Sequence, residues 1–297
     1  MMRTEYANAK INLYLNVVGK RPNGYHDIVS IMQTVTLCDV LTIDFEKADK
    51  TEITLKASGN DAMPTDSRNL AWKAADTFLT ENRLMGTVTI SIEKHIPMSA
   101  GLAGGSADAA AVLRGLNRLC GSPLSTEALC QLGAKLGADV PFCIVGGGAL
   151  VTGIGDNLAP ISCMPQAPLV VACMGDGVST PWAYGALDER YDSFADTKRN
   201  DPNADSIVQA IKEQNTSKIC DQCFNLFESV VPSVQPYVDK LKKAMLDCGA
   251  IRSMMSGSGP SVFGIFQNDE DAKKACDMLL KMGASAAVCY PCTLGDA

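Results

Sequence analysis

The sequence predicts an α+β protein made of two domains. Segments with strand-like and helix-like patterns alternate in both halves of the chain, which favours mixed layers of sheet and helix. The chain has 297 residues, and at roughly 150 residues per domain this length suggests two domains or one large one. An uncharged stretch with three prolines, residues 160–168, separates the halves. We therefore expect domains at residues 1–160 and 161–297.

Strands dominate the beginning of the first half. Four segments are rich in Ile, Leu, Val and Thr and alternate, partly or cleanly, between apolar and polar residues. They are residues 10–18, 40–45, 51–55 and 87–92. Apolar residues three or four apart predict helices between and after these strands. The helices are expected at residues 67–81, at about 106–119, and from a Ser125 cap through residue 136.

The second half continues the alternation of strands and helices. Short apolar segments predict strands at residues 169–174 and 261–266. Helical spacing of apolar residues follows at residues 205–213, 234–246 and 270–282. The two halves are therefore expected to have the same mixed architecture.

The charge balance excludes some classes of partner. The formal net charge is −7 and the sequence pI is about 4.9, whereas a nucleic-acid surface needs clustered Lys and Arg. The amino terminus shows no apolar secretory core. Glycine or proline interrupts the uncharged stretches too often for a membrane span. We expect a cytoplasmic protein that binds neither nucleic acid nor membrane.

The chain holds 12 cysteines, among them two CxxC pairs, Cys220/Cys223 and Cys289/Cys292. Four thiolates could hold one zinc ion. The alternative is that they are reduced and buried as small apolar residues. We favour the alternative, because Cys220 and Cys223 alternate with apolar residues as on the buried face of a helix.

A glycine-rich segment, residues 97–111, is the most informative part of the chain. It follows a predicted strand and opens a predicted helix. Gly101, Gly104 and Gly105 permit unusual backbone angles and let a ligand approach the main chain, and the free N–H groups of a helix start favour negative charge. The segment therefore predicts an anion site, although its spacing is neither that of a P-loop nor that of a dinucleotide fingerprint. The alternative is a tight turn with a serine N-cap and a closely packed helix.

Three further segments carry candidate site residues. Lys10 and Asn12 share one face of a strand, and a buried lysine is costly unless paired; the alternative is an edge lysine that reaches solvent. Asp139 follows a predicted helix. The alternative to a role in the site is a structural role in a turn or a helix cap. Residues 255–261 form a second glycine–serine loop. The alternative to a role in the site is an ordinary turn before a strand.

Together these segments resemble the GHMP small-molecule kinases. Residues 9–13, 97–111 and 255–261 match the first, central and third motifs of that family, in order and over nearly the whole chain. The resemblance implies an ATP-dependent kinase with an alcohol acceptor. It also implies an N-terminal nucleotide-binding domain and a C-terminal α/β-plait-like domain that completes the substrate cleft.

Two more segments resemble one branch of the family. Residues 21–27 (Arg-Pro-Asn-Gly-Tyr-His-Asp) and 137–141 (Gly-Ala-Asp-Val-Pro) are similar to those of the kinases that act on a cytidine-diphospho methylerythritol, on the methylerythritol phosphate route to isoprenoid precursors. The implied reaction is phosphorylation of the 2-hydroxyl, in a monomer or homodimer. A kinase for another small alcohol and a non-catalytic nucleotide-binding protein are the alternatives.

The resemblance implies roles in catalysis and nucleotide binding. Asp139 matches the catalytic base and Lys10 its partner, so the two side chains are expected to meet. Where residues 106–108 read Ser-Ala-Asp, some relatives carry Ser-Ser-Asn. ATP is implied as cofactor with Mg²⁺, for which Ser106 is a possible contact. The ATP-binding residues are expected to be Pro97, Met98, Ser99, Ala100, Gly101, Leu102, Ala103, Gly104, Gly105, Ser106 and Ala107.

The resemblance also implies substrate-binding residues. Asn12 is expected at the acceptor diol, and Tyr25 and His26 at the cytosine ring. Tyr184 matches the ring that stacks on cytosine from the second domain, with Trp182 as its rival. His95, at a strand end, is expected to be structural.

Overall fold

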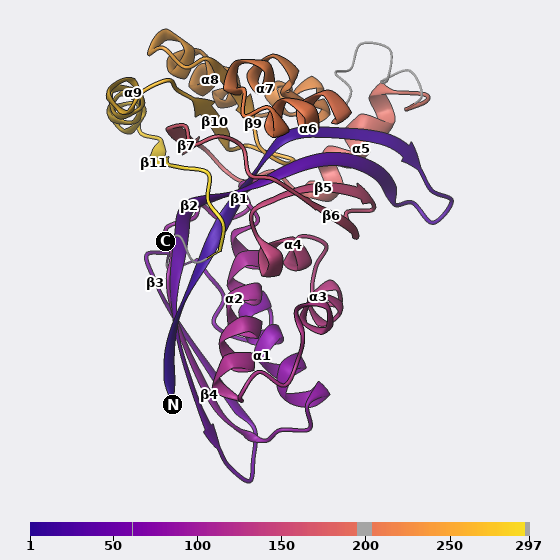
Figure 1. Cartoon of the computed structure of the whole chain (residues 1–297), viewed down its shortest axis with the longest axis vertical. Helices are drawn as coiled ribbons and strands as arrows, with labels where there is room; N and C mark the ends of the chain where they lie inside the picture. The colour runs from indigo at the N-terminus through magenta and orange to yellow at the C-terminus, as the bar shows by residue number, and fades with distance from the viewer. Residues whose placement is uncertain (61, 195–203, 295–297) are drawn as a thin grey trace.

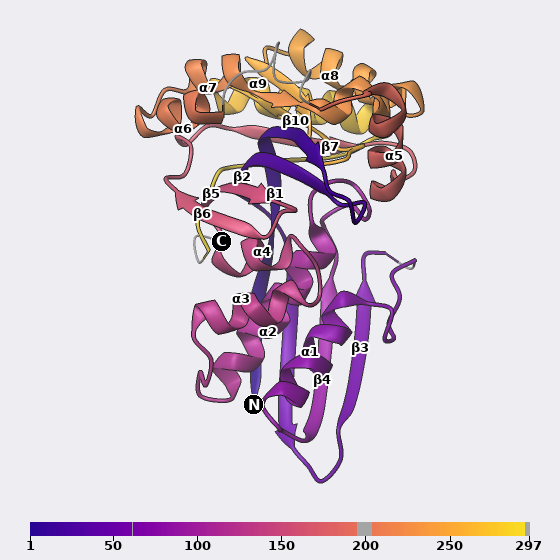
Figure 2. The ribbon, with the colours of Figure 1, turned by 90° about the vertical axis from the view of Figure 1, so that its right-hand side faces the viewer.

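Two stacked β-sheets organise the chain in the computed structural model, which describes residues 1–60, 62–194 and 204–294. The first sheet and its helices fill the lower and middle parts of Figure 1, and the second sheet and its helices lie along the top. Figure 2 shows the same two layers from the side. The predicted α+β class is confirmed.

The first layer is built on a seven-stranded sheet with the path β3–β4–β2–β1–β8, from which β5 pairs with β2 and β6. Its strands are β1 (Met2–Lys20), β2 (His26–Lys47), β3 (Glu52–Ser58), β4 (Gly86–Glu93), β5 (Gly148–Gly153), β6 (Asn157–Ile161) and β8 (Phe224–Asn225). The predicted strands at 10–18 and 40–45 are only parts of β1 and β2. Register shifts in the β1–β2 pair break the alternation of apolar and polar residues, which hid the full strand lengths from the sequence.

Four helices cover one side of this sheet. They are α1 (Leu70–Glu81), α2 (Gly104–Leu119), α3 (Thr126–Ala134) and α4 (Val140–Val145). Phe78 of α1, Leu113 of α2 and Ile90 of β4 are fully buried in the core between helices and sheet. The Ser125 cap is confirmed, because its side chain accepts a hydrogen bond from the Ala128 amide. The short helix α4 was not predicted.

The second layer is a four-stranded antiparallel sheet in the order β11–β7–β10–β9. Its strands are β7 (Leu169–Cys173), β9 (Arg252–Met255), β10 (Val262–Ile265) and β11 (Ser285–Cys289). Its helices are α5 (Thr180–Arg190), α6 (Ala204–Lys212), α7 (Thr216–Gln222), α8 (Tyr237–Asp247) and α9 (Asp269–Lys281), with 3₁₀ turns η2 (Leu226–Ser229) and η3 (Val231–Ser233) before α8. This is the predicted α/β plait. The predicted helix at 234–246 starts later because these turns and Pro236 precede it.

A linking segment, a strand pairing and a shared core join the two layers. Residues 162–168 run from β6 of the first sheet to β7 of the second, and the exact domain boundary there stays a prediction. Strand β8 returns to pair with β1. A shared core packs Ile11 and Leu13 of β1 against Val171 of β7 and Phe263 of β10. None of the helices in the described residues is both long and apolar enough to cross a bilayer.

Both CxxC pairs lie in buried surroundings. Cys220 and Cys223 are buried at the end of α7, and Cys289 and Cys292 are buried near the end of the described chain. Burial raises the pKa of the Cys220 thiol to about 11 and that of Cys289 to about 12. Across residues 1–60, 62–194 and 204–294, no group of three or more His, Cys, Asp or Glu side chains could hold a metal ion.

Candidate active site

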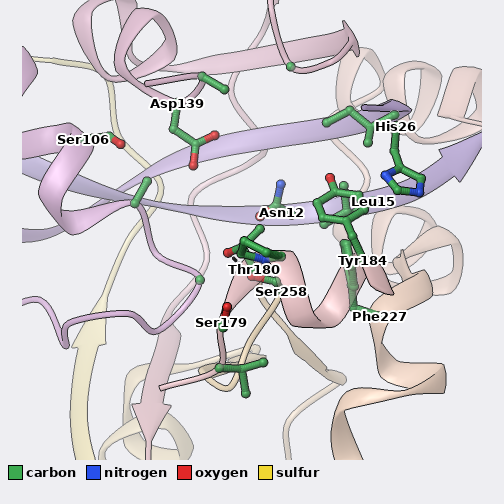
Figure 3. A pocket seen from close by; sticks show the side chains of 18 of the residues that line it. Asn12, Leu15, His26, Ser106, Asp139, Ser179, Thr180, Tyr184, Phe227 and Ser258 are labelled. Atoms are coloured by element: carbon green, nitrogen blue, oxygen red, sulfur yellow. Dashed lines mark hydrogen bonds between the residues drawn. The ribbon is translucent and has the colours of Figure 1, made fainter. Parts of the chain in front are cut away.

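A cleft of about 950 Å³ opens between the two layers. Its walls come from β1, the start of β2, the glycine-rich loop, the residues before α4, the start of α5 and the loop after β9. Figure 3 shows Asp139 pointing into it, with Ser106 on one side and Tyr184 and His26 on the other. One continuous cleft therefore joins the glycine loop to the aromatic side chains.

The glycine loop presents the start of α2 to this cleft. Helix α2 begins at Gly104, two residues earlier than predicted, and its N-cap is Ala103 in a left-handed conformation with φ of 58°. No side chain caps the helix, so the alternative of a serine N-cap is wrong. The N–H groups of Gly104, Gly105 and Ser106 lie in the first turn, where no intrahelical carbonyl accepts them. This arrangement suits an anion, because the helix dipole also places partial positive charge there.

The carbonyl of Gly101 is where the three sequence motifs meet. It accepts hydrogen bonds from Lys10 Nζ at 3.1 Å and from Ser256 Oγ at 3.0 Å. Gly101 has φ of 78°, and a Cβ at this position would lie 2.1 Å from the Ser256 carbonyl oxygen. Glycine is required at this contact for both reasons. The loop is therefore held by one residue from the first strand and one from the third motif.

Lys10 and Asp139 face each other across the floor of the cleft. Lys10 Nζ lies 4.0 Å from Asp139 Oδ2. Lys10 is buried and also donates to Asn12 Oδ1 at 2.7 Å, whereas Asp139 is 34% exposed. Asp139 stands at the N-cap of α4 without a side-chain capping bond, so the alternative of a simple cap is wrong. The alternative of a solvent-reaching edge lysine is wrong as well.

Asn12 is held rigidly beside this pair. Its Nδ2 donates to Ser30 Oγ at 2.8 Å, and Ser30 Oγ in turn donates to the Tyr14 carbonyl at 2.7 Å. These bonds determine the orientation of the amide, because its oxygen must face Lys10. The side chain lines the cleft between the glycine loop and the aromatic end.

Aromatic side chains form the far end of the cleft. Tyr184 of α5 stacks on His26 of β2, with ring centroids 4.7 Å apart and planes at 21°, and meets the ring of Phe227 edge-on. Burial, with the Asp139 charge adding to it, raises the pKa of the Tyr184 phenol to about 12, so it stays protonated at neutral pH. Tyr25 also lines the cleft and is 60% exposed, whereas Trp182 is 40% exposed and lies outside the lining.

Comparison with known proteins identifies the family. The model of the GHMP kinases N terminal domain matches residues 69–147, and that of the GHMP kinases C terminal matches residues 207–285. A 4-diphosphocytidyl-2-C-methyl-D-erythritol kinase from Caldicellulosiruptor saccharolyticus is 44% identical over 273 residues, which cover 92% of this chain and 91% of that protein. A protein of the same name from Bacillus pumilus is 43% identical over 270 residues, 91% of this chain and 90% of that protein.

The chain belongs to the GHMP kinases, in the branch of the 4-diphosphocytidyl-2-C-methyl-D-erythritol kinases. It is an ATP-dependent small-molecule kinase of isoprenoid precursor synthesis. A crystal structure of 4-(cytidine 5'-diphospho)-2C-methyl-D-erythritol kinase matches with a TM-score of 0.78 at 31% identity, over 99% of this chain and 100% of that chain. Homoserine kinase from Cytophaga hutchinsonii shares the fold, with a TM-score of 0.73 at 20% identity over 99% of this chain and 95% of that chain.

The residues predicted to hold ATP do not all face the cleft of this kinase. Seven of the eleven line it: Ser99, Ala100, Gly101, Ala103, Gly104, Gly105 and Ser106. Leu102 and Ala107 point into the core and are almost fully buried. Pro97 and Met98 precede the lining residues. The side chains of Leu102 and Ala107 therefore support the loop from within the core and do not face the cleft.

A buried charge group that the sequence analysis missed supports the loop of the kinase from behind. Lys94 Nζ donates to Asp39 and, at 2.8 Å, to Asp108 Oδ2, and all three side chains are buried. The other oxygen of Asp39 accepts from the amides of His95 and Ile96, just before the loop. Burial raises the pKa of Asp108 to about 7, against the attraction of Lys94. The second Asp108 oxygen has no hydrogen-bond partner among the described residues.

The far end of the cleft also contains residues that the sequence analysis missed. Asp188 Oδ1 lies 2.7 Å from His26 Nε2, and Thr180 and Ser258 place their hydroxyl groups 2.9 Å apart at the cleft wall. A helix over residues 180–190 would have placed Asp188 on the same face as Tyr184, four residues earlier. That helix was not predicted, because its residues show little amphipathic pattern and include Gly185.

Proposed function

We propose that this kinase transfers the γ-phosphoryl group of ATP to the 2-hydroxyl of 4-diphosphocytidyl-2-C-methyl-D-erythritol. One observation carries the proposal. Lys10 and Asp139, 4.0 Å apart, stand in a single cleft between an anion-binding helix start and an aromatic, hydrogen-bonding end. Phosphoryl transfer between a nucleotide and a base-carrying alcohol needs these three parts in this order.

The glycine loop would hold the ATP phosphates. The first-turn amides of α2 are free of capping side chains, and such amides bind phosphate with the help of the helix dipole. The Ser106 hydroxyl lies at the cleft and could contact Mg²⁺ or its water ligands. Mg²⁺ commonly keeps phosphate and water as most of its ligands, so one protein oxygen fits such a site. When bound, the ion would offset the negative charge of the phosphates.

Asp139 would act as the general base. An alcohol is a weak nucleophile, and a carboxylate within hydrogen-bond reach accepts its proton as the oxygen–phosphorus bond forms. Lys10 spends two of its N–H groups on Asn12 and Gly101, and an ammonium has three. The third N–H is therefore available to Asp139 or to a phosphoryl oxygen, where its charge stabilises the transition state.

The aromatic end would hold cytosine. Tyr25 and Tyr184 offer rings for stacking, and His26 offers a ring nitrogen to the edge of the base. Asn12, held by Ser30 and Lys10, would contact the acceptor diol. Trp182 lies outside the cleft lining, which favours Tyr184 over it as the stacking ring.

An assay of ADP release tests this proposal. The purified kinase is given ATP and Mg²⁺ with 4-diphosphocytidyl-2-C-methyl-D-erythritol, with free methylerythritol, or with no acceptor. ADP should be released at a high rate only with the cytidine-diphospho acceptor, and the product should carry one new phosphate. Equal turnover of free methylerythritol, or of alcohols without cytidine, would contradict the proposed substrate.

A further inference from the structure

We propose that Asp188 is a positioning residue that fixes the tautomer of His26 and thereby selects cytosine over uracil. The inference rests on the proposed function, because it concerns the base that the far end of the cleft would bind. It goes further in assigning a role to a carboxylate whose two oxygens contact Lys20 and His26. Hydrogen bonds, packing and charge around the His26 ring support this role.

Asp188 links His26 to the neighbouring strand. Its Oδ1 lies 2.7 Å from His26 Nε2, and its Oδ2 accepts a hydrogen bond from Lys20 Nζ at 2.8 Å. Lys20 ends β1 and His26 begins β2, so the carboxylate joins both sides of the hairpin turn to α5. Lys20 therefore holds the carboxylate in the orientation in which its other oxygen meets the ring.

The carboxylate determines which ring nitrogen carries the hydrogen. Partial burial raises the pKa of Asp188, but the hydrogen bonds from Lys20 and His26 outweigh it and hold that pKa below its ordinary value. An ionised carboxylate only accepts hydrogen bonds. Nε2 of His26 must then be the donor, and in the neutral ring Nδ1 is left as an acceptor. Among the described residues Nδ1 has no hydrogen-bond partner.

Packing prevents the ring from turning over. Tyr184 covers one face of His26, and Phe194 meets the ring edge-on with centroids 5.5 Å apart. Tyr184 and Asp188 are four residues apart on α5 and thus share one face of the helix. The same helix face therefore holds the ring in its plane and binds one of its nitrogens. His26 is only 8% exposed, which leaves little room for another orientation.

An acceptor at this place discriminates between the two pyrimidines. Cytosine carries an amino group, a hydrogen-bond donor, where uracil carries a carbonyl, an acceptor. A fixed Nδ1 acceptor matches the cytosine amino group and faces the uracil carbonyl with like polarity. A buried polar group left without its partner is costly, so the uridine-diphospho counterpart of the substrate should be rejected. With the opposite tautomer the preference would be reversed.

The tautomer can be measured without any substrate. The chain has only two histidines, and His95→Gln leaves His26 alone. Long-range ¹H–¹⁵N spectra at pH 8.5, above the ordinary histidine pKa of about 6.5, should show the pattern of a neutral ring with hydrogen on Nε2. In Asp188→Asn this pattern should shift toward a mixture of tautomers. Hydrogen on Nδ1, or on both nitrogens, in the unsubstituted Asp188 protein would overturn the proposal whatever the substrate is.

Kinetics then test the consequence for specificity. Asp188→Asn should raise KM for the cytidine-diphospho substrate by about tenfold and lower the cytidine-to-uridine ratio of kcat/KM by at least about tenfold, with kcat and the ATP KM nearly unchanged. Lys20→Met removes only the hydrogen bond from Lys20 to Asp188. It should change the same KM and the same ratio by less, about threefold. Glu189→Gln, a neighbouring exposed carboxylate on α5, is the matched control and should change nothing.

The two measurements separate the inference from the proposed function. If the spectra show the expected tautomer but no acceptor shows any dependence on cytidine, the proposed function fails. If cytidine dependence is found and Asp188→Asn leaves both the spectra and the cytidine-to-uridine ratio unchanged, the role of Asp188 fails. An equal loss of activity toward every acceptor, with a lower melting temperature, would make Asp188 merely structural and would also overturn the proposal.

Discussion

The two ends of the cleft are each supported by three linked side chains, but the order of charges is reversed. Behind the glycine loop an ammonium, Lys94, stands between two carboxylates, and all three are buried. At the aromatic end a carboxylate, Asp188, stands between Lys20 and an imidazole, close to the surface. Burial, with the charge of Asp39 adding to it, raises the pKa of Asp108, whereas the hydrogen bonds from Lys20 and His26 lower the pKa of Asp188.

This difference corresponds to what each end presents to a ligand. The glycine-loop end, where we propose that the nucleotide binds, offers main-chain amides, so its side chains serve to hold a loop in shape and can be fully desolvated. The aromatic end offers side chains, so their ring orientation and hydrogen positions matter and are determined by neighbours at the cleft. Lys10 and Asp139 lie between the two ends. Substitutions at the two ends should therefore separate into different kinetic and thermodynamic effects.

The largest effect is expected between the ends, at Asp139. Asp139→Asn keeps the size of the side chain but removes the proton acceptor, so kcat should fall on the order of 10²–10⁴-fold. Both KM values should change little, because neither end is touched. Single-turnover measurement of ADP formation checks this, with the exposed Asp49→Asn as the control. Near-normal turnover in Asp139→Asn would show that another group accepts the proton.

A methyl group at Gly101 should disrupt the nucleotide end. In Gly101→Ala the new Cβ meets the Ser256 carbonyl at 2.1 Å and the backbone keeps a positive φ, so the loop must move. We expect the ATP KM to rise on the order of 10-fold or more and stability to fall by about 2 kcal/mol. Gly121→Ala is the matched control, since Gly121 has φ of 84° and nothing within 4 Å of its Cβ position.

The control separates strain from displacement of the loop. Gly121→Ala should lose about 1 kcal/mol of stability through backbone strain alone and leave the ATP KM unchanged. Calorimetric melting and initial rates at varied ATP are the measurements. If both variants lose the same stability and show the same ATP KM, the close approach of Gly101 to the third motif does not affect nucleotide binding.

Removal of a ring should affect only the aromatic end. Tyr184→Ala exposes one face of His26 and removes a stacking surface, so KM for the cytidine-diphospho substrate should rise about tenfold, consistent with about 1–3 kcal/mol for a stacked base. The ATP KM should stay the same. Trp182→Ala, two residues away and outside the cleft lining, serves as control. A larger KM change in Trp182→Ala than in Tyr184→Ala would reassign the stacking ring.

The smallest effect concerns stability at the buried charge group. The raised pKa of Asp108 means that the folded state binds its proton more tightly than the unfolded state, so stability falls as pH rises from about 4 to about 7. Asp108→Asn removes this decline. The variant should therefore gain on the order of 1 kcal/mol relative to the parent at pH 8 and little at pH 4. Urea unfolding at both pH values measures it, with exposed Asp76→Asn as control.

An equal stability difference at pH 4 and pH 8 would contradict a role for this proton. It would mean that Asp108 is ionised throughout, in balance with Lys94. The reversed order of charges at the two ends would then have no consequence for proton binding.

Contiguous segments of the sequence predicted much of the fold and site. Lys10, Asn12, Tyr25 and His26 belong to one hairpin, and their motifs could be read without knowing the fold. The glycine loop could be read in the same way because main-chain binding depends on local residue types. The start of α2 was misplaced by two residues, since Ala103 adopts a left-handed conformation that residue type does not suggest.

The missed residues are those whose partners are distant in the chain. Asp39 and Lys94 are 55 residues apart, and His26 and Asp188 are 162 apart. No spacing rule connects such pairs, and each aspartate alone looks like a surface residue. Long-range pairing depends on how the two layers stack, and that arrangement has no local pattern. The role of a side chain that holds another side chain therefore emerged only from the structure.

The junction at Gly101 has a consequence for when this kinase becomes active during synthesis. Its carbonyl is held by Lys10 from the beginning of the chain and by Ser256 from near the end. A nascent chain that has left the ribosome only as far as α8 would lack the second of these clamps. Phosphoryl transfer should thus begin only after the segment with Ser256 has docked on the glycine loop.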